Sequence, residues 1–216
     1  RLREEGGFRL SNAQLAALYL EGSVAAQEPA FADIARATLD YLDREMSDPL
    51  GGFHSATDAD SATPDGHSEE GWFFTWTPAE VDAALPPEQA RAVKAWYRID
   101  AQAELDGRNV PHTPRTAASV AEALGLDVDT LRRTVDAARP TLYAARAKRP
   151  PPLKDDKIVT AWNGLAISAF ARVGWGLGEG RYVERARRAA GFLLAHVRGE
   201  DGRLRRTWSE GQARHH

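Results

Sequence analysis

Two short segments of the sequence concentrate carboxylates that could carry out acid–base chemistry. The first contains Asp58 and Asp60 and ends with Glu69 and Glu70. Two carboxylates that converge on a cleft acquire different pKa values, so that one can act as an acid and the other as a base. Sugar hydrolysis uses such pairs. The segment therefore makes Asp58 and Asp60 candidate catalytic residues.

The same segment allows two other interpretations. Asp58, Asp60 and Glu69 stand at positions 1, 3 and 12 of an EF-hand loop, which would bind calcium. Ala62 at position 5 has no ligand atom, however, and Thr63 replaces the required glycine at position 6. Acidic residues mixed with Ser, Thr, Pro and Gly are also typical of a solvated turn. These alternatives remain open from the sequence.

The second segment combines charge with an aromatic side chain. Asp155, Asp156 and Lys157 come just before a predicted helix that carries Trp162 and Asn163. Such a group can bind a hydroxylated ligand, because the indole stacks on a sugar face and the amide offers a donor and an acceptor. Aspartate near a helix start is also favoured by the helix dipole, and an inward tryptophan usually packs in a core.

Composition excludes several classes of function. The 216 residues include no cysteine, so disulfides, zinc–cysteine sites, iron–sulfur clusters and thiol nucleophiles are ruled out. The histidines lack metal-ligand spacing on one helix face, and no phosphate-binding or dinucleotide-binding glycine motif is present. We therefore predict no metal and no cofactor. A net charge of −3 gives no support for nucleic acid as a partner, and no apolar run is long enough to span a membrane. The expected location is the cytoplasm.

Helical periodicity dominates the rest of the chain. Apolar side chains recur at helical spacing, and glycine and proline end the runs. Thr77, Pro78 and Glu80 have the spacing of a capping box, which predicts a helix start. Two short strands are expected at 52–55 and 72–76. The predicted fold class is all-α with a small two-stranded β-hairpin near 52–76. The other expected helices include 87–98, 117–124, 127–147, 161–176 and 180–198.

The sequence also repeats itself at a constant separation of 151 residues. The matched pairs include Asn12 with Asn163, Phe31 with Tyr182, Tyr41 with Phe192 and Gly51 with Gly202. Self-similarity of this kind indicates a repeat architecture. A separation of 151 residues corresponds to about three helical hairpins of some fifty residues each. We therefore expect residues 1–216 to form part of an (α/α)6 toroid, with exposed edges that call for a partner or further chain.

Several motifs carry a resemblance to a known family. The matching segments are Gly51-Gly52-Phe53-His54-Ser55-Ala56, Asp58-Ala59-Asp60-Ser61, Glu69-Glu70-Gly71-Trp72-Phe73-Phe74-Thr75-Trp76-Thr77-Pro78, Asp155-Asp156-Lys157-Ile158, Trp162-Asn163-Gly164-Leu165, Asn12-Ala13-Gln14-Leu15-Ala16 and Gly107-Arg108-Asn109-Val110. Together they resemble the YyaL-like family, which includes spermatogenesis-associated protein 20 of animals. The resemblance follows the order of the family's motifs over nearly the whole chain.

The resemblance implies a larger protein and a set of site residues. Members of the family have a thioredoxin-like domain, which carries their cysteines, followed by a six-hairpin α/α domain similar to glycosidases and sugar 2-epimerases. This chain resembles the helical part alone, without the thioredoxin-like domain. The residues carried over as site positions are Asp58, Asp60, Glu70, Asp155, Asp156, Lys157, Trp162 and Asn163. One departure is the family's His-Phe-Glu-Lys motif, which is missing before Asn12.

The resulting hypothesis is a carbohydrate-binding or carbohydrate-active toroid fragment, related to hydrolases or epimerases. Its catalytic residues would be Asp58, Asp60 and Asp156. Its substrate-binding residues would be Glu70, Asp155, Lys157, Trp162 and Asn163. The alternative is a non-catalytic helical scaffold that supports a thioredoxin-like domain or a protein partner. The expected partners are thus a sugar-like molecule, the rest of the toroid and the thioredoxin-like domain, with no nucleic acid and no membrane.

Overall fold

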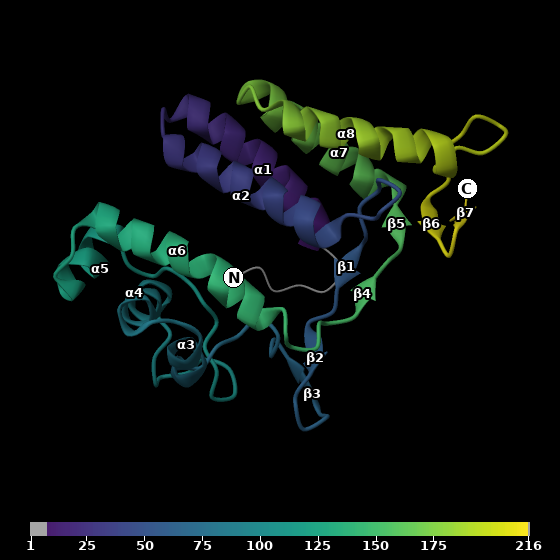
Figure 1. Cartoon of the computed structure of the whole chain (residues 1–216). Helices are drawn as coiled ribbons and strands as arrows, with labels where there is room; N and C mark the ends of the chain where they lie inside the picture. The colour runs from purple at the N-terminus through teal and green to yellow at the C-terminus, as the bar shows by residue number, and fades with distance from the viewer. Residues whose placement is uncertain (1–7, 216) are drawn as a thin grey trace. The chain divides into compact units, whose positions relative to one another are not determined.

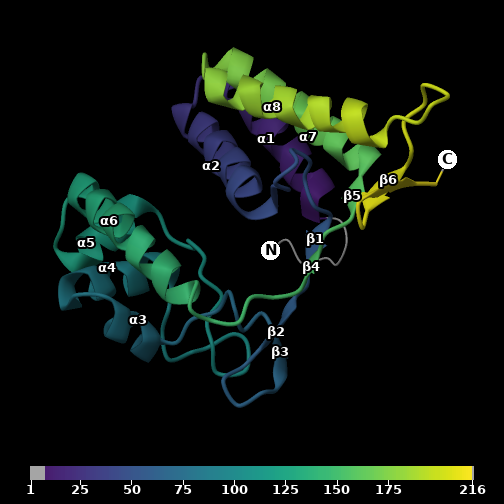
Figure 2. The same ribbon diagram turned by 45° about the vertical axis from the view of Figure 1, so that its right-hand side comes forward.

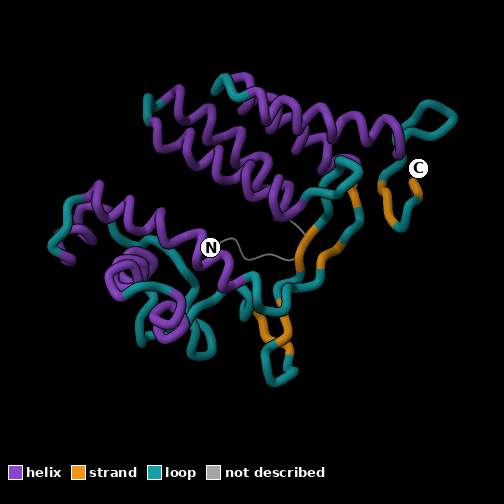
Figure 3. Tube along the Cα trace, viewed as in Figure 1, coloured by secondary structure: helices purple, strands orange, loops and turns teal. Residues whose placement is uncertain are grey.

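The chain divides into two compact units, which we describe separately. The computed structural model describes residues 8–215. Unit 1 combines Arg1–Asp58 with Lys154–His216, and unit 2 is Ala59–Leu153. Both units consist mainly of helices joined by loops and a few short strands (Figure 3). The predicted mostly helical fold with a small β-hairpin is confirmed.

Unit 1 contains two helical hairpins, which lie side by side in Figures 1 and 2. The first hairpin is α1 (Phe8–Ala25) and α2 (Pro29–Met46), and the second is α7 (Thr160–Gly176) and α8 (Gly180–Phe192), which continues as the π-helical turn η1 (Leu193–Val197). The short strands of unit 1 are β1 (Ala56–Thr57), β4 (Lys154–Asp155), β5 (Ile158–Val159), β6 (Thr207–Ser209) and β7 (Gln212–Arg214). β1 pairs with β4, and β5, β6 and β7 form a second antiparallel sheet.

The turns that follow the two hairpins repeat the same backbone hydrogen bonds. In the first, His54 N–H donates to the Met46 carbonyl at 2.9 Å, and an isolated bridge joins Ser47 to Phe53. In the second, Arg205 N–H donates to the Val197 carbonyl at 3.0 Å, and the bridge joins Arg198 to Leu204. Each second-hairpin residue stands 151 positions after its counterpart. The structure thus contains the repeat that the sequence predicts.

The two copies of the repeat are arranged differently from the expected succession of hairpins, however. We expected 151 residues to correspond to about three successive hairpins. Instead, α1 packs directly against α7, so the two copies of the repeat are neighbours in unit 1. Unit 2 accounts for the intervening sequence, because its 95 residues run from Ala59 to Leu153 as a separate compact body.

The core of unit 1 fills the space among the four helices. The ring of Phe53 stacks on Phe170 with centroids 5.2 Å apart, and Phe170 meets Tyr182 edge-on. Small residues of α1 and α7, such as Ala16 and Ala166, let the two backbones approach closely, and both are buried. The aromatic residues of the turn and of both helices of the second hairpin therefore share one apolar cluster.

Unit 2 contains four helices and one β-hairpin. Its elements are β2 (Asp60–Ala62), β3 (Ser68–Glu70), α3 (Pro78–Ala84), α4 (Pro87–Tyr97), α5 (Ala117–Leu124) and α6 (Val128–Arg146). The predicted capping box is confirmed, since Thr77 Oγ1 accepts from the Glu80 N–H and Glu80 accepts from the Thr77 N–H. Buried side chains including Val81, Val93 and Leu131 hold the helices together.

The β-hairpin lies between the two predicted strands rather than along them. β2 pairs with β3 in antiparallel register, with Asp60 opposite Glu70 and Ala62 opposite Ser68. The predicted strand at 52–55 is instead a buried turn of unit 1, and the predicted strand at 72–76 is mostly turn. Phe53 among small residues and the aromatic residues of 72–76 gave both stretches an apolar character, which resembles a strand signal in the sequence. The pairing also leaves no EF-hand loop over this stretch.

Candidate functional site

The predicted site residues fall into two groups, one in each unit. Unit 1 holds the segment that contains Asp155, Asp156 and Lys157, together with Trp162, Asn163 and Asp58, which follows β1. Unit 2 holds Asp60 and Glu70 on its β-hairpin.

In unit 1, the backbone of the acidic segment is held by the preceding turn. Ser55 N–H donates to the Asp155 carbonyl at 3.0 Å, and Ser55 Oγ donates to the Lys157 carbonyl at 2.5 Å. His54 Nδ1 lies 3.1 Å from the carbonyl oxygen of Asp156. The side chains of Asp155, Asp156 and Lys157 are exposed, so the fold fixes their backbone and presents the charged groups to solvent.

Asn163 has a structural contact set. Its side chain is fully buried, with Oδ1 accepting from the Phe53 N–H at 2.7 Å. Its Nδ2 donates to the carbonyls of Phe53 and Val159, each at 3.0 Å. Both amide protons and the amide oxygen are therefore engaged with backbone. Trp162, one residue earlier, is half-buried.

In unit 2, the hairpin register places two carboxylates next to each other. Asp60 and Glu70 are directly opposed on β2 and β3, and both side chains are exposed. Opposed residues of an antiparallel pair have Cβ atoms about 5 Å apart on one face. The hairpin is tied to the next segment, because Gly71 N–H donates to the Ala59 carbonyl and Phe73 N–H donates to Ser61 Oγ.

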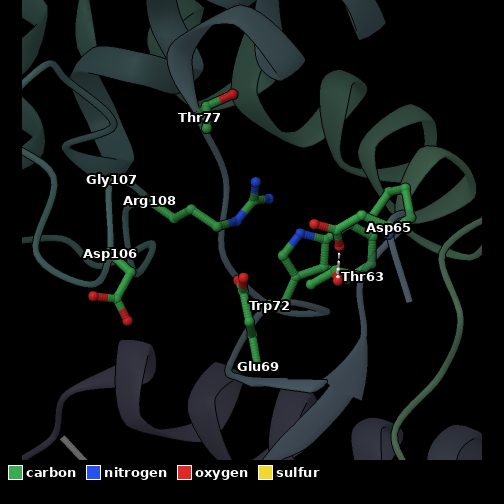
Figure 4. Close-up of a pocket in the computed structure, with 9 residues that line it drawn as sticks. Thr63, Asp65, Glu69, Trp72, Thr77, Asp106, Gly107 and Arg108 are labelled. Carbon is green, nitrogen blue, oxygen red and sulfur yellow. Dashed lines mark hydrogen bonds between the residues drawn. The ribbon is translucent and has the colours of Figure 1, made fainter. Parts of the chain in front are cut away.

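An open hollow of about 400 Å³ lies beside this hairpin within unit 2 (Figure 4). The side chains that line it combine acceptors, donors and an aromatic ring. They are Thr63, Pro64, Asp65, Glu69, Trp72, Thr77, Asp106 and Arg108, with Gly107. Figure 4 shows Glu69 and Asp106 on the same side of Arg108. Two of the motifs that carry the family resemblance, at 69–78 and 107–110, thus meet in one place.

A charged network supports the wall of the hollow. Arg108 Nη2 donates to Glu80 Oε2 at 2.7 Å, and its guanidinium lies 5.5 Å from the centre of the Trp72 ring. Arg149 donates to the carbonyls of Trp72, Phe73 and Thr75. Its guanidinium also lies 4.3 Å from the centre of the Trp76 ring. These cation–π contacts and hydrogen bonds fix the turn that presents Trp72.

The same network sets the ionisation of Glu80. Partial burial disfavours the charged carboxylate, but the Thr77 N–H and the guanidinium groups of Arg108 and Arg149 favour it more strongly, so the pKa of Glu80 is lowered. Burial lowers the pKa of the Arg149 guanidinium, and the neighbouring Arg108 acts in the same direction against the opposing effect of Glu80. Glu80 thus serves as the counter-ion that keeps two arginines beside the hollow.

The sequence did not identify most of these lining residues. Arg108 belongs to a motif that matched the family, and Trp72 follows Glu70 by two positions, but neither signal assigned a role. Asp65 and Asp106 lie in loops separated by about forty residues, and only the fold brings them together. Among residues 8–215, no three histidine or carboxylate side chains gather in a way that could hold a metal ion.

The fold and these sites define a helical-hairpin protein with an inserted helical unit, and the sequence comparisons add its relatives. The chain is 33% identical to spermatogenesis-associated protein 20 of Homo sapiens and to that of Mus musculus, over 92% of its length in each case. It is also 29% identical to an uncharacterized protein of Caenorhabditis elegans over 76% of its length. No family model matches the chain.

These matches confirm the resemblance found in the sequence. The chain belongs to the spermatogenesis-associated protein 20 family and matches one segment of its members. It spans 28% of the length of the human and mouse relatives, so they are much longer proteins. None of the helices in the described part of the chain combines the length and apolar character needed to cross a membrane.

Proposed function

We propose that the chain binds a carbohydrate-like small molecule in the hollow beside Trp72. The observation that carries the proposal is the mixture of groups there: the carboxylates of Glu69 and Asp106 can accept hydrogen bonds, Arg108 can donate them, and Trp72, which is 9% exposed, places an aromatic ring in the wall. A polyhydroxylated ligand needs such alternating donors and acceptors with an apolar patch. The charged network behind Trp72 supports the proposal because it holds the ring in a fixed position.

The opposed carboxylates of Asp60 and Glu70 provide the candidate chemistry, on the face of the β-hairpin opposite to Glu69, because successive strand residues point to opposite faces. We assign Asp60 as the acid–base group and Glu70 as its ligand-binding neighbour, since they stand directly opposite each other on β2 and β3. Close carboxylate pairs serve hydrolysis and epimerisation of sugars, because one group can donate a proton while the other accepts one. In unit 1, Asp58 and Asp156 stay candidate catalytic residues, and Asp155, Lys157 and Trp162 stay candidate ligand-binding residues.

A ligand screen tests this proposal. Thermal unfolding of the chain would be measured with neutral sugars, amino sugars and N-acyl amino sugars, and hits would be titrated by calorimetry. We expect one class to raise the unfolding temperature and Glu69→Gln or Asp106→Asn to weaken its binding by tenfold or more, which corresponds to about 1.4 kcal/mol. Glu122→Gln, an exposed change elsewhere in unit 2, is the matched control. If no sugar raised the unfolding temperature, the proposal would be contradicted.

A second candidate function is a helical scaffold, and one observation favours it. The amide of Asn163 and the hydroxyl of Ser55 form their hydrogen bonds with backbone groups of unit 1. In this alternative, the acidic motifs stabilise turns and helix ends, and unit 1 supports a thioredoxin-like domain or a protein partner. The two functions separate experimentally, because Asn163→Ala would lower stability while leaving sugar binding by the folded protein unchanged.

A further inference from the structure

Trp72 carries a polar group that the chain itself leaves without a partner. Its side chain lines the hollow of unit 2, yet the residue is only 9% exposed, and the guanidinium groups of Arg108 and Arg149 lie 5.5 and 5.3 Å from the centre of its ring. The indole N–H has no acceptor among the residues that the structure describes. Buried donors are nearly always hydrogen-bonded, so a donor of this kind in the wall of a hollow indicates an acceptor on a ligand.

A second donor at the hollow belongs to Arg108, the one basic residue of its lining. Nε donates to Thr75 Oγ1 at 2.9 Å, and Nη2 donates to both carboxylate oxygens of Glu80, at 3.0 and 2.7 Å. Nη1 has no acceptor in the described chain. Glu80 also pairs with Arg149 at 3.2 Å, so the two arginines and this glutamate together carry one positive charge. Nη1 therefore has a hydrogen bond to give to a ligand oxygen, while the guanidinium already has its counter-ion.

The acceptors of the hollow are three carboxylates. Asp65 accepts a hydrogen bond from Thr63 Oγ1, and His67 Nε2 lies 4.0 Å from its carboxylate. The carboxylates of Glu69 and Asp106 are exposed and have no ion-pair or hydrogen-bond partner within residues 8–215. Three negative charges thus outweigh the one positive charge of the arginine network, and a concave site with such an excess attracts a cation.

From these groups we propose that the ligand of the hollow is an amino sugar whose amine is free and protonated. The inference rests on the proposed function and narrows its substrate class. The ammonium group binds on the side of Glu69 and Asp106, which Figure 4 shows on the same side of Arg108. Hydroxyl or ring oxygens of the sugar accept from the Trp72 N–H and from Arg108 Nη1. An N-acylated amine carries no charge for the carboxylates, and a sugar acid would add a negative charge to a site that already has an excess.

Calorimetric titration of the full chain with matched ligands tests this choice of class. Glucosamine, N-acetylglucosamine and glucose share one ring and differ at carbon 2, and the same series is run in the galacto and manno configurations. At about pH 6.5, below the pKa of such an amine, we expect one free amino sugar to bind about tenfold more tightly than its neutral and N-acetyl counterparts, because hydrogen bonds between charged groups are the stronger ones.

Charge-removing variants locate the preference. Glu69→Gln and Asp106→Asn should each remove much of the preference for the amine while changing the affinity for the neutral sugar little. Both residues are exposed, so the variants should keep the fold, which circular dichroism checks. Glu122→Gln, at an exposed position of α5, removes the same charge away from the hollow and should keep the full preference.

The Trp72 N–H gives an independent readout by nuclear magnetic resonance. In a ¹⁵N-labelled chain, Trp72→Phe removes one indole resonance and so assigns it, and we expect the amino sugar to shift that resonance downfield. The indole resonance of Trp175, which is 87% exposed in unit 1, should stay in place. A neutral or N-acetyl sugar that binds as tightly as the amine, or an amino sugar that leaves the Trp72 resonance unmoved, would overturn this inference while the proposed function stands. If none of the sugars binds, both are overturned.

Discussion

The side-chain amide of Asn163 binds the backbone of Phe53 at both of its polar groups, across 110 residues of sequence. Phe53 N–H donates to Oδ1 at 2.7 Å, and Nδ2 donates to the Phe53 carbonyl at 3.0 Å. This pair of bonds joins the start of α7 to the turn that follows α2. The side-chain amide binds Phe53 as a neighbouring strand would, since an amide presents a donor and an acceptor much as a peptide group does.

The first prediction concerns this amide. Asn163→Ala should lower the free energy of unfolding by about 2–4 kcal/mol, because it leaves the buried N–H and carbonyl of Phe53 without partners, at about 1–3 kcal/mol each. Urea denaturation followed by tryptophan fluorescence measures the change. Ser168→Ala, at an exposed position of the same helix, should change stability by less than about 0.5 kcal/mol. A loss below about 1 kcal/mol for Asn163→Ala would show that the amide does not hold the turn.

Arg185 leads to a second prediction. Its side chain is 3% exposed, its Nε donates to Asp43 at 2.6 Å, and its Nη atoms donate to the carbonyls of Gly51 and Gly52. The guanidinium also lies 3.8 Å from the centre of the Phe53 ring. One side chain thus holds the same turn from α8. Burial lowers the pKa of the guanidinium, and Asp43 opposes that effect.

Replacing this arginine should be strongly destabilising. We expect Arg185→Met to lower the unfolding free energy by about 3 kcal/mol, since two buried carbonyls lose their charged donor. Arg185→Lys should recover only part of the loss, because an ammonium lacks the planar fork that reaches several acceptors at once. The control is Arg187→Met, whose side chain is 75% exposed and pairs with Glu184, and whose effect should stay below about 0.5 kcal/mol. Equal melting temperatures for the Arg185→Met and Arg187→Met proteins would refute the assigned role.

The sequence predicted the repeat and the local signals but not the contacts between distant segments. The match of Asn12 with Asn163 and of Gly51 with Gly202 in the sequence predicted the repeat, because a repeated fold requires similar residue types at equivalent positions. The capping box at Thr77 was readable for a similar reason, since it depends on residues three positions apart.

The long-range contacts had no such signal. Arg149 donates to the carbonyl of Trp72, 77 residues earlier. Nothing in the sequence around Arg149 distinguishes it from an arginine that is exposed to solvent. The separation of unit 2 from unit 1 was also hidden, because an insertion between two repeats lengthens the spacing in the same way as additional repeats do. The candidate site in unit 2 was therefore found only in part, through Asp60, Glu69 and Glu70.

A third prediction concerns the acid sensitivity of unit 2. The pKa of Glu80 is lower in the folded protein than its ordinary value of 4.5. A carboxylate with a depressed pKa contributes stability that is fully present above the unfolded value and is lost as the pH falls through the folded value. Glu80→Gln should therefore destabilise the chain at pH 7, by about 2 kcal/mol from the lost charged hydrogen bonds. The difference between the two proteins should shrink as the pH falls below about 4.5.

Denaturation midpoints measured from pH 7 down to pH 3 check this behaviour. Glu122→Gln, at an exposed position of α5, should leave the pH dependence unchanged. If the Glu80→Gln protein kept the same stability difference throughout this range, the ion pairs with Arg108 and Arg149 would not be the source of the effect.

The repeat itself provides the fourth prediction, because its two turn glycines differ in surroundings. Gly51 has φ of +121°, and a Cβ there would lie 2.9 Å from the backbone carbonyl oxygen of Arg188. Gly202 is its counterpart, with φ of +77° and no atom within 4 Å of the corresponding Cβ position. Gly202→Ala should therefore cost only the left-handed backbone conformation, about 1 kcal/mol. Gly51→Ala should cost about 3 kcal/mol or more, since a close backbone contact adds to the conformational strain. Chemical denaturation of the two variants side by side measures the difference, and similar losses for both would mean that the turn after the first hairpin can move away from α8.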